Sequence, residues 1–419
     1  MTLPSAVSPQ HETASPSIDE SARFGSEPST VASAGSMRLL ARLLPRLTHG
    51  RLTIETDAGD SIILDGGQPG PQARITIHRK RCLWRMLAGG DVAFAEAYMA
   101  GDWSSPDLIA LVALGLANDH AIASAGTSLA NVARKIRHAL NGNTLRGSRR
   151  NIAAHYDLGN DFYAHWLDAG MTYSSALFEH PGQTLEAAQD VKLDLICSLL
   201  ALGGRESVLE IGCGWGGVAE RLIERHACKV TALTLSERQL AFTRDRLRAW
   251  PARADFRLQD YRAVTGRYDR IVSIEMLEAV GEAYWPTYFA KVAQCLREDG
   301  IAVVQAITIA DDRFEAYRSN PDFIQRYIFP GGMLPTASAI AREANAAGLV
   351  VESQNFFGAS YALTLAHWQR RFQRAWPDIA RIGFDARFKR TWEYYLAYCQ
   401  AGFEAGRVDV GLFKLRRVA

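Results

Sequence analysis

The stretch SVLEIGCGWGG, residues 207–217, limits what this chain can fold into more than any other part of it. Apolar residues enclose an acid, Glu210, and four glycines follow within positions 212–217. A buried strand that breaks into a glycine-rich turn and opens a helix lets the backbone approach a nucleotide, because glycine has no Cβ in the way. The stretch therefore predicts a nucleotide site at the edge of an α/β sheet.

The glycines alone fit two kinds of nucleotide site. Gly212, Gly214 and Gly217 satisfy the G-x-G-x-x-G pattern of dinucleotide-binding folds. An acid before alternating glycines is instead typical of methyltransferases that use S-adenosylmethionine (SAM). In that second interpretation the loop comprises Glu210, Gly212, Cys213, Gly214, Trp215 and Gly216.

The strands after the loop favour SAM. A dinucleotide fold needs an acid at the end of its second strand, about 20 residues past the glycines, to bind a ribose. Here the second strand, 229–234, ends without one, and the next acid, Glu237, belongs to the following helix. The third strand is followed by Asp260 and Tyr261, which suit the amine and the face of an adenine ring. We therefore expect a SAM methyltransferase rather than a dehydrogenase.

Strand and helix patterns alternate regularly from residue 201, which predicts one doubly wound parallel sheet. Strands are expected at 207–211, 229–234, 254–258, 269–274 and 301–307, and helices at 184–200, 215–226, 237–249 and 284–297. Before this region, β-rich runs predict a hairpin at 51–66 and a third strand at 73–78. Helices are expected at 80–89 and 91–99, and a further one with Ser105 as its cap and Pro106 in its first position.

Composition divides the chain into parts. We expect a disordered tail at 1–37, a small N-terminal α/β domain for lipid binding or assembly at 38–120, a basic linker at 121–150 and a methyltransferase domain at 151–410. The linker is either a solvated connector or a patch for anionic lipid headgroups.

Whole-chain properties exclude several classes of function. The formal net charge of +2 predicts no strong affinity for nucleic acid. The six cysteines form no C-x-x-C pair, which argues against a metal site and for reduced thiols in the cytoplasm. No apolar run approaches the roughly 20 residues that a membrane-spanning helix needs.

Eight sequence blocks, in order, resemble the cyclopropane fatty acid synthase family, SAM-dependent enzymes that modify double bonds in phospholipid acyl chains. The blocks are HYDLGNDFY (155–163), MTYSSALF (171–178), VLEIGCGWGG (208–217), TLSERQ (234–239), YDRIVSIEMLEAVG (268–281), YIFPGGMLP (327–335), FFGASYALTLAHW (356–368) and RTWEYYLAYCQAGF (390–403). YSSA and EMLEAVG bring the chain close to a plant-like branch of that family.

The resemblance implies a class I SAM-methyltransferase fold, Rossmann-like and α/β, with a small N-terminal lipid-associated domain. It also implies a cytoplasmic enzyme bound peripherally to the inner membrane surface, with unsaturated phospholipid as substrate and a homodimer formed through the N-terminal domain. The expected product is a cyclopropane ring; a methylated alkene, methylene or methyl-branched chain is the alternative. Methylation of a small molecule and a non-catalytic lipid-binding role remain open.

The resemblance further implies the residues of the site. Around SAM it places Tyr173, Ser174, the 208–216 loop, Thr234, Ser236, Gln239, Asp260 and Tyr261. Ring-forming relatives hold a bicarbonate ion as base, and its contacts match Glu278 and Tyr361, with Ser175 in place of a Cys and Gln305 in place of a His. Ala279 replaces a second His.

Methyl transfer to an alkene leaves a carbocation, so the site must exclude water and remove one proton. The candidate bases are a bicarbonate or one of two carboxylates, Glu275 and Glu278, with Glu278 favoured by its position in the family motif. Cys399 matches a Cys sometimes assigned as catalytic, but a thiol within an aromatic helix is more often buried and inert.

Overall fold

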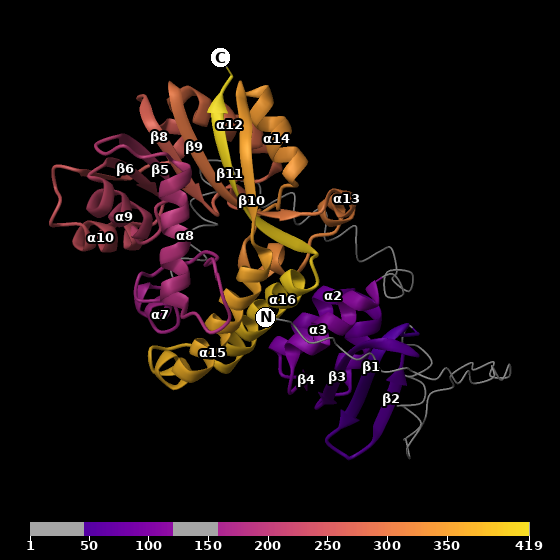
Figure 1. The fold of residues 1–419 in the computed structure, drawn as a ribbon. Helices are drawn as coiled ribbons and strands as arrows, with labels where there is room; N and C mark the ends of the chain where they lie inside the picture. Colours follow the sequence, from indigo (N-terminus) through magenta and orange to yellow (C-terminus); the bar gives the residue numbers. More distant parts are fainter. Residues whose placement is uncertain (1–45, 120–157, 419) are drawn as a thin grey trace, which may run out of the picture.

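A computed structural model describes residues 46–119 and 158–418 of the chain. The expected tail and basic linker, 1–37 and 121–150, lie outside the described residues. Figure 1 shows a small N-terminal sheet in indigo, a larger sheet in magenta to yellow, and long helices between the two. None of the helices in the described ranges is long and apolar enough to cross a membrane.

The N-terminal sheet has the strand order β2-β1-β3-β4. Its elements are β1 (His49–Thr56), β2 (Ser61–Asp65), β3 (Gln68–Ile77), α2 (Arg81–Met99), β4 (Trp103–Ser104) and α3 (Leu108–Ala117). The expected hairpin is present as antiparallel β1 and β2, and β3 runs parallel to β1. The two helices expected at 80–89 and 91–99 are the two halves of α2, which a kink divides at Gly90, where φ is 62°.

The start of α3 differs from the expectation. Asp107 is the cap, and its side chain accepts a hydrogen bond from the backbone N–H of Ala110 at 2.9 Å. Ser105 lies outside the helix, where its hydroxyl accepts from the N–H of Asp107. A carboxylate at this position also suits the positive end of the helix dipole.

The large sheet has the order β10-β11-β9-β8-β5-β6-β7. Its strands are β5 (Ser207–Ile211), β6 (Lys229–Thr234), β7 (Ala254–Leu258), β8 (Tyr268–Ile274), β9 (Leu296–Ile309), β10 (Leu349–Phe356) and β11 (Val408–Arg417). The five predicted strands are present and mutually parallel. The expectation of a wholly parallel sheet was wrong, because β11 lies antiparallel between β9 and β10. This last strand also carries the large part past the expected limit at residue 410.

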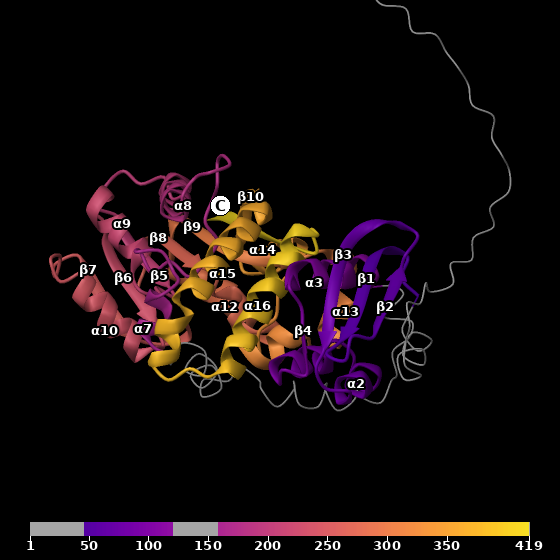
Figure 2. The same cartoon turned by 90° about the horizontal axis from the view of Figure 1, so that it is seen from below.

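Helices cover both faces of the large sheet and connect it to the small one. They are α7 (Asn160–Ala164), α8 (Leu185–Leu199), α9 (Gly217–His226), α10 (Glu237–Arg246), α11 (Leu277–Val280), α12 (Trp285–Cys295), α13 (Asp311–Ser319), α14 (Ala337–Ala346), α15 (Gly358–Arg381) and α16 (Ala386–Glu404). Short 3₁₀ segments η1 (Tyr261–Ala263) and η2 (Glu282–Tyr284) and a π-helical turn η3 (Ile324–Ile328) complete the part. Helix α16 packs against α15 and also contacts α2 and α3, as both views show (Figures 1 and 2).

The strand order places one edge of the large sheet where ligands bind. From β5 the chain continues outward through β6 and β7 and then returns to β8 on the other side of β5. Such a switch point separates the loops that follow the two central strands and leaves a crevice at their carboxyl ends. The loops after β5 and β8 carry the glycines and Glu275.

Candidate active site

The glycine loop takes a backbone shape that other residues rarely adopt. Gly214 and Gly216 have φ values of 50° and 84°. A Cβ on Gly216 would lie 2.6 Å from the Cγ2 of Thr243, whereas a Cβ on Gly214 would meet nothing within 4 Å. Packing against α10 therefore requires a glycine at 216, whereas the space beside Gly214 is open.

A cavity of about 160 Å³ lies at the carboxyl ends of β5, β6 and β8. Ten of the residues expected to bind the cofactor line it: Tyr173, Ser174, Glu210, Gly212, Cys213, Gly214, Trp215, Thr234, Gln239 and Tyr261. Glu275 lines it as well, beside Met276, which the sequence analysis did not single out. The crevice predicted from the glycines thus exists and is bordered by five separate segments of chain.

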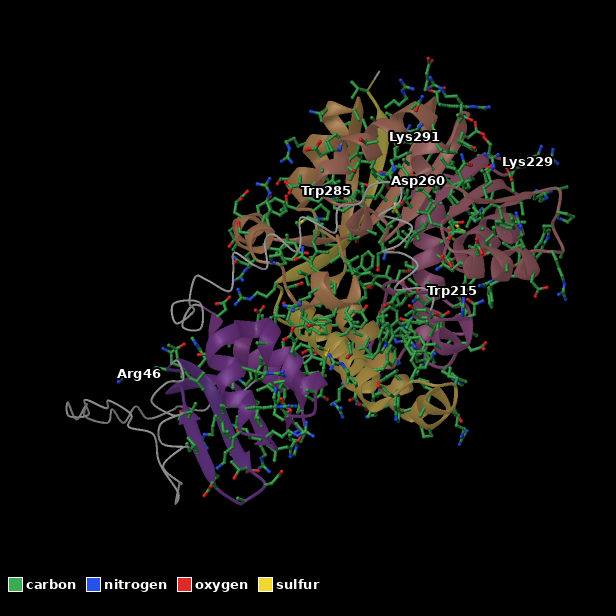
Figure 3. All side chains as sticks on the ribbon, turned by 180° about the vertical axis from the view of Figure 1, so that it is seen from behind. Arg46, Trp215, Lys229, Asp260, Trp285 and Lys291 are labelled. Atoms are coloured by element: carbon green, nitrogen blue, oxygen red, sulfur yellow. The ribbon has the colours of Figure 1, made fainter. Side chains whose placement is uncertain are left out.

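Three residues expected at the cofactor do not line the cavity. Gly216 is buried under Thr243, and Ser236 caps α10 by accepting from the N–H of Gln239. The carboxylate of Asp260 accepts hydrogen bonds from Arg262, the shorter one at 2.7 Å. Trp215 and Asp260, both labelled in Figure 3, lie on the large part of the molecule and away from the N-terminal sheet.

Glu210 is the acid that begins the loop, and it is almost completely buried. Its Oε2 finds no hydrogen-bond partner among the described residues. Burial raises its pKa to about 8. An unsatisfied carboxyl oxygen beside a cavity fits a ligand that donates hydrogen bonds, as the hydroxyl and amino groups of SAM do. The residues present therefore fit this cofactor.

Glu275 follows β8 directly and has a positive φ of 49°. Its Oε1 accepts hydrogen bonds from the N–H of Ser175 at 2.8 Å and from Nε2 of Gln305 at 2.7 Å. Its Oε2 accepts from the hydroxyl of Tyr361 at 2.7 Å. A non-glycine residue with positive φ carries strain, which the surrounding contacts must hold in place. Three donors from three segments thus fix one carboxylate at the cavity wall.

Glu278 lies one turn further on, outside the lining of the cavity. One of its oxygens accepts from the N–H of Ile307, and the other has no partner in the described part of the chain. Burial, together with the charge of Glu275, raises its pKa to about 8. Ser175, Gln305 and Tyr361 were expected to hold a bicarbonate together with Glu278, and in the structure all three donate to Glu275.

Cys399 also lies outside the cavity lining. Burial raises the pKa of its thiol well above the ordinary range, so the thiolate needed for nucleophilic attack is not formed. Its neighbour on α16, Tyr395, shares a hydrogen bond with Tyr173 at 2.9 Å between the two hydroxyls. The helix therefore borders the site through aromatic rings rather than through sulfur.

Lys192, on α8, is a site residue that the sequence analysis missed. It is completely buried, and its ammonium donates to the hydroxyl of Ser174 at 2.7 Å. The signal was present in the sequence, because this lysine shares the helical spacing of the apolar positions Ala188 and Ile196. A lysine on the apolar face of an amphipathic helix is an exception that predicts a polar neighbour in the core.

Comparisons with known proteins agree with this geometry. The family model described as mycolic acid cyclopropane synthetase matches residues 143–413. The chain belongs to this family. It is a SAM-dependent methyltransferase, with the class I fold that was expected.

Three relatives illustrate the similarity. The chain is 38% identical to tuberculostearic acid methyltransferase UfaA1 of Mycobacterium tuberculosis, over 92% of either chain. It is 34% identical to cyclopropane-fatty-acyl-phospholipid synthase of Escherichia coli, over 86% of this chain and 91% of the relative. The solved structure of mycolic acid cyclopropane synthase CmaA1 complexed with SAH and CTAB is 30% identical, with a TM-score of 0.60 over 64% of this chain and 98% of that one.

Replacing Gly216 by alanine is expected to destabilise the protein by about 2–4 kcal/mol and to weaken SAH binding, because positive φ and the contact with Thr243 act together. Gly182→Ala is the matched control, since Gly182 has a similar φ of 87° and nothing within 4 Å of its Cβ position. It should cost only about 1–2 kcal/mol. Chemical denaturation and calorimetric titration with SAH measure both effects. Equal losses in the two variants would contradict the close contact.

Replacing Glu278 by glutamine is expected to stabilise the protein progressively as the pH rises. The pKa of Glu278 is raised from 4.5 to about 8, so the unfolded chain releases this proton at a lower pH than the folded one. Its stabilising contribution is complete below about pH 4.5 and is lost as the pH approaches 8. The variant escapes that loss, and its advantage in unfolding free energy should grow by at least about 1 kcal/mol between these values.

The control for this measurement is Glu298→Gln, since Glu298 is an exposed acid. Its unfolding free energy should follow that of the unmodified protein across the whole pH range. If Glu278→Gln followed it too, Glu278 would not be protonated in the folded protein near neutral pH.

Proposed function

We propose that this enzyme transfers the methyl group of SAM to a carbon–carbon double bond in an unsaturated phospholipid acyl chain, and that Glu275 removes the proton that completes the reaction. The single observation that carries this proposal is the carboxylate of Glu275, held at the cavity wall by Ser175, Gln305 and Tyr361. The two relatives that match over most of the chain are named for methylation or cyclopropanation of fatty acids.

SAM supplies an electrophilic methyl group when bound. The residues that would hold it are those of the glycine loop and Glu210. The Oε2 of Glu210 has no partner among the described residues, so it is able to accept a hydrogen bond from the cofactor. Thr234 and Gln239 border the same cavity, and their side chains are hydrogen-bonded to each other at 2.9 Å. These groups support a cofactor position between the loop and the carboxylate of Glu275.

A bicarbonate ion does not fit this site. The donors that the family resemblance assigns to it, at Ser175, Gln305 and Tyr361, already donate to Glu275. A second anion at the same place would have to displace a carboxylate and would repel it. We therefore assign the role of base to Glu275 and derive no step through bicarbonate.

The carboxylate of Glu275 does not need to be a strong base for this reaction. When the alkene takes up a methyl group, a positive charge develops on the acyl chain, and the neighbouring C–H protons become strongly acidic. Glu275 accepts one of them, and the C–H electron pair forms the new carbon–carbon bond. Three hydrogen bonds weaken a carboxylate as a base, but they also fix its position, which proton transfer requires. The ring of Tyr361, packed 4.4 Å from that of Phe403, helps to keep water out.

Two products are candidates, and they differ in the proton that Glu275 removes. Loss from the transferred methyl closes a cyclopropane ring, the product named for the Escherichia coli relative. Loss from an adjacent chain carbon leaves a methylene or methylated alkene. The similarity to the tuberculostearic acid methyltransferase favours this second outcome.

The assay that tests this function incubates the protein with SAM and monounsaturated phospholipid and follows the acyl chains by mass spectrometry. A gain of one CH₂ unit is expected, and hydrogenation then separates the products, because an alkene takes up hydrogen and a ring resists it. Glu275→Gln should lower turnover by about 100-fold or more, since glutamine cannot accept the proton.

Glu278→Gln is the matched variant for this assay. It removes a carboxyl one helical turn away and should retain turnover within about 10-fold, because Glu278 does not border the cavity. If Glu278→Gln lost activity and Glu275→Gln did not, Glu278 and not Glu275 would be the base. No mass gain with the unmodified protein would refute lipid methylation and leave a small-molecule substrate or a non-catalytic lipid-binding role.

The place where the enzyme meets its substrate is a further part of the proposal. We place it at the inner membrane surface as a peripheral protein and as a homodimer formed through the N-terminal sheet. Light scattering should give twice the chain's mass of 46.2 kDa. Sedimentation with vesicles of unsaturated phospholipid should pull the protein down, and a monomer that stays in the supernatant would contradict both statements.

A further inference from the structure

A buried positive charge lies behind the candidate base. Lys192 has no exposed surface, and burying an ammonium costs several kcal/mol unless opposite charges compensate. Two carboxylates do so: those of Glu275, after β8, and Asp168, in the loop after α7, both act on Lys192 through their charge. Asp168 is in turn held by the N–H and hydroxyl of Thr172. Because burying the ammonium of Lys192 is costly, its charge is a candidate for a functional role.

Helix α8 also holds the chain segment that contacts the base. Gln189 donates from Nε2 to the carbonyl oxygen of Ser174 at 3.0 Å, and Lys192 donates to the hydroxyl of the same residue. The next residue, Ser175, donates its backbone N–H to Glu275. The buried face of α8 is therefore linked to the carboxylate of Glu275 through the adjacent residues Ser174 and Ser175, with a hydrogen bond at each end of the link.

We propose that Lys192 is a positioning residue of the methyl-transfer reaction, which keeps the carboxylate of Glu275 ionised and fixes the Ser174–Ser175 segment against it. This inference rests on the proposed function, in which Glu275 is the base. Lys192 does not itself line the cavity; it contacts Ser174, which does, so it acts through Ser174 and Glu275.

The electrostatics of the cluster support this role. Burial raises the pKa of Glu275, while the charge of Lys192 opposes that rise. The hydrogen bonds from Tyr361, Ser175 and Gln305 oppose the rise as well. Without Lys192 the pKa of Glu275 would rise further, so that a larger fraction of Glu275 would hold a proton and be unable to accept another. The positive charge of Lys192 thus helps to make the base available.

The test is a double-mutant cycle in the lipid methylation assay. Lys192→Met keeps the volume of the side chain and removes its charge, and it should lower kcat by about 100-fold at neutral pH, close to the effect of Glu275→Gln. Combining the two substitutions should cause no further loss, because the lysine then has no base to act on. The Kd for SAH should change by less than about 10-fold.

The pH profile distinguishes charge from simple support. In Lys192→Met the acid limb of kcat should move upward by at least one pH unit, so that activity partly returns in alkaline buffer. Ser174→Ala removes the hydrogen bond from Lys192 but keeps the charge, and its acid limb should stay where it is in the unmodified protein. A shifted limb in the first variant and an unshifted limb in the second support the proposal.

Three outcomes would overturn it. These are full activity in Lys192→Met, a further large loss on adding Lys192→Met to Glu275→Gln, and the same unshifted profile in Lys192→Met and Ser174→Ala. Circular dichroism and SAH binding establish that each variant is folded. The activity of the unmodified protein is measured first. If it does not methylate lipid, the proposed function itself is refuted, before any variant is compared.

Discussion

The carboxylate of Glu275 is the interaction on which the rest of the candidate active site depends. It ties together the segment before α8, the central strand β9 and the long helix α15 through Ser175, Gln305 and Tyr361. Because these donors come from segments far apart in sequence, the wall of the cavity exists only when the large part is fully folded. The positive φ of Glu275 is part of the same arrangement, since it turns the side chain from the sheet edge into the site.

Three acids of this site differ in their hydrogen-bond partners because their surroundings differ. Glu275 has three donors and a nearby ammonium, which favour its ionised form. Glu278 and Glu210 each have an oxygen with no partner among the described residues and a pKa raised to about 8. Glu210 borders the cavity, where a cofactor can supply the missing hydrogen bond, whereas Glu278 faces the backbone of β9. Environment, and not residue type, therefore suits the three acids to the different roles proposed for them.

Much of the fold could be predicted from local patterns. The five parallel strands lie where apolar runs and glycine turns placed them, and α8 lies within the helix expected at 184–200. Strands β10 and β11 were missed, since β10 has one exposed face and β11 follows a long helical region, so neither has the βα alternation that marked the others. Ten of the expected cofactor residues line one cavity, because the glycine loop fixes where the strand ends must meet.

The sequence by itself determined the methyl donor and the sheet that binds it, because strand periodicity, glycines without a Cβ and an acid before them are local properties. It also supplied every donor that surrounds the candidate base. Only the tertiary structure decided which carboxylate they surround. Glu275 and Glu278 are three residues apart in one motif, but Glu275 precedes α11 and lines the cavity, whereas Glu278 lies within α11 and accepts from the N–H of Ile307. The same holds for Lys192, which contacts Ser174 only when α8 packs behind that residue. Opposite charges compensate the burial of an ammonium when they are close in space, whether or not they are close in sequence.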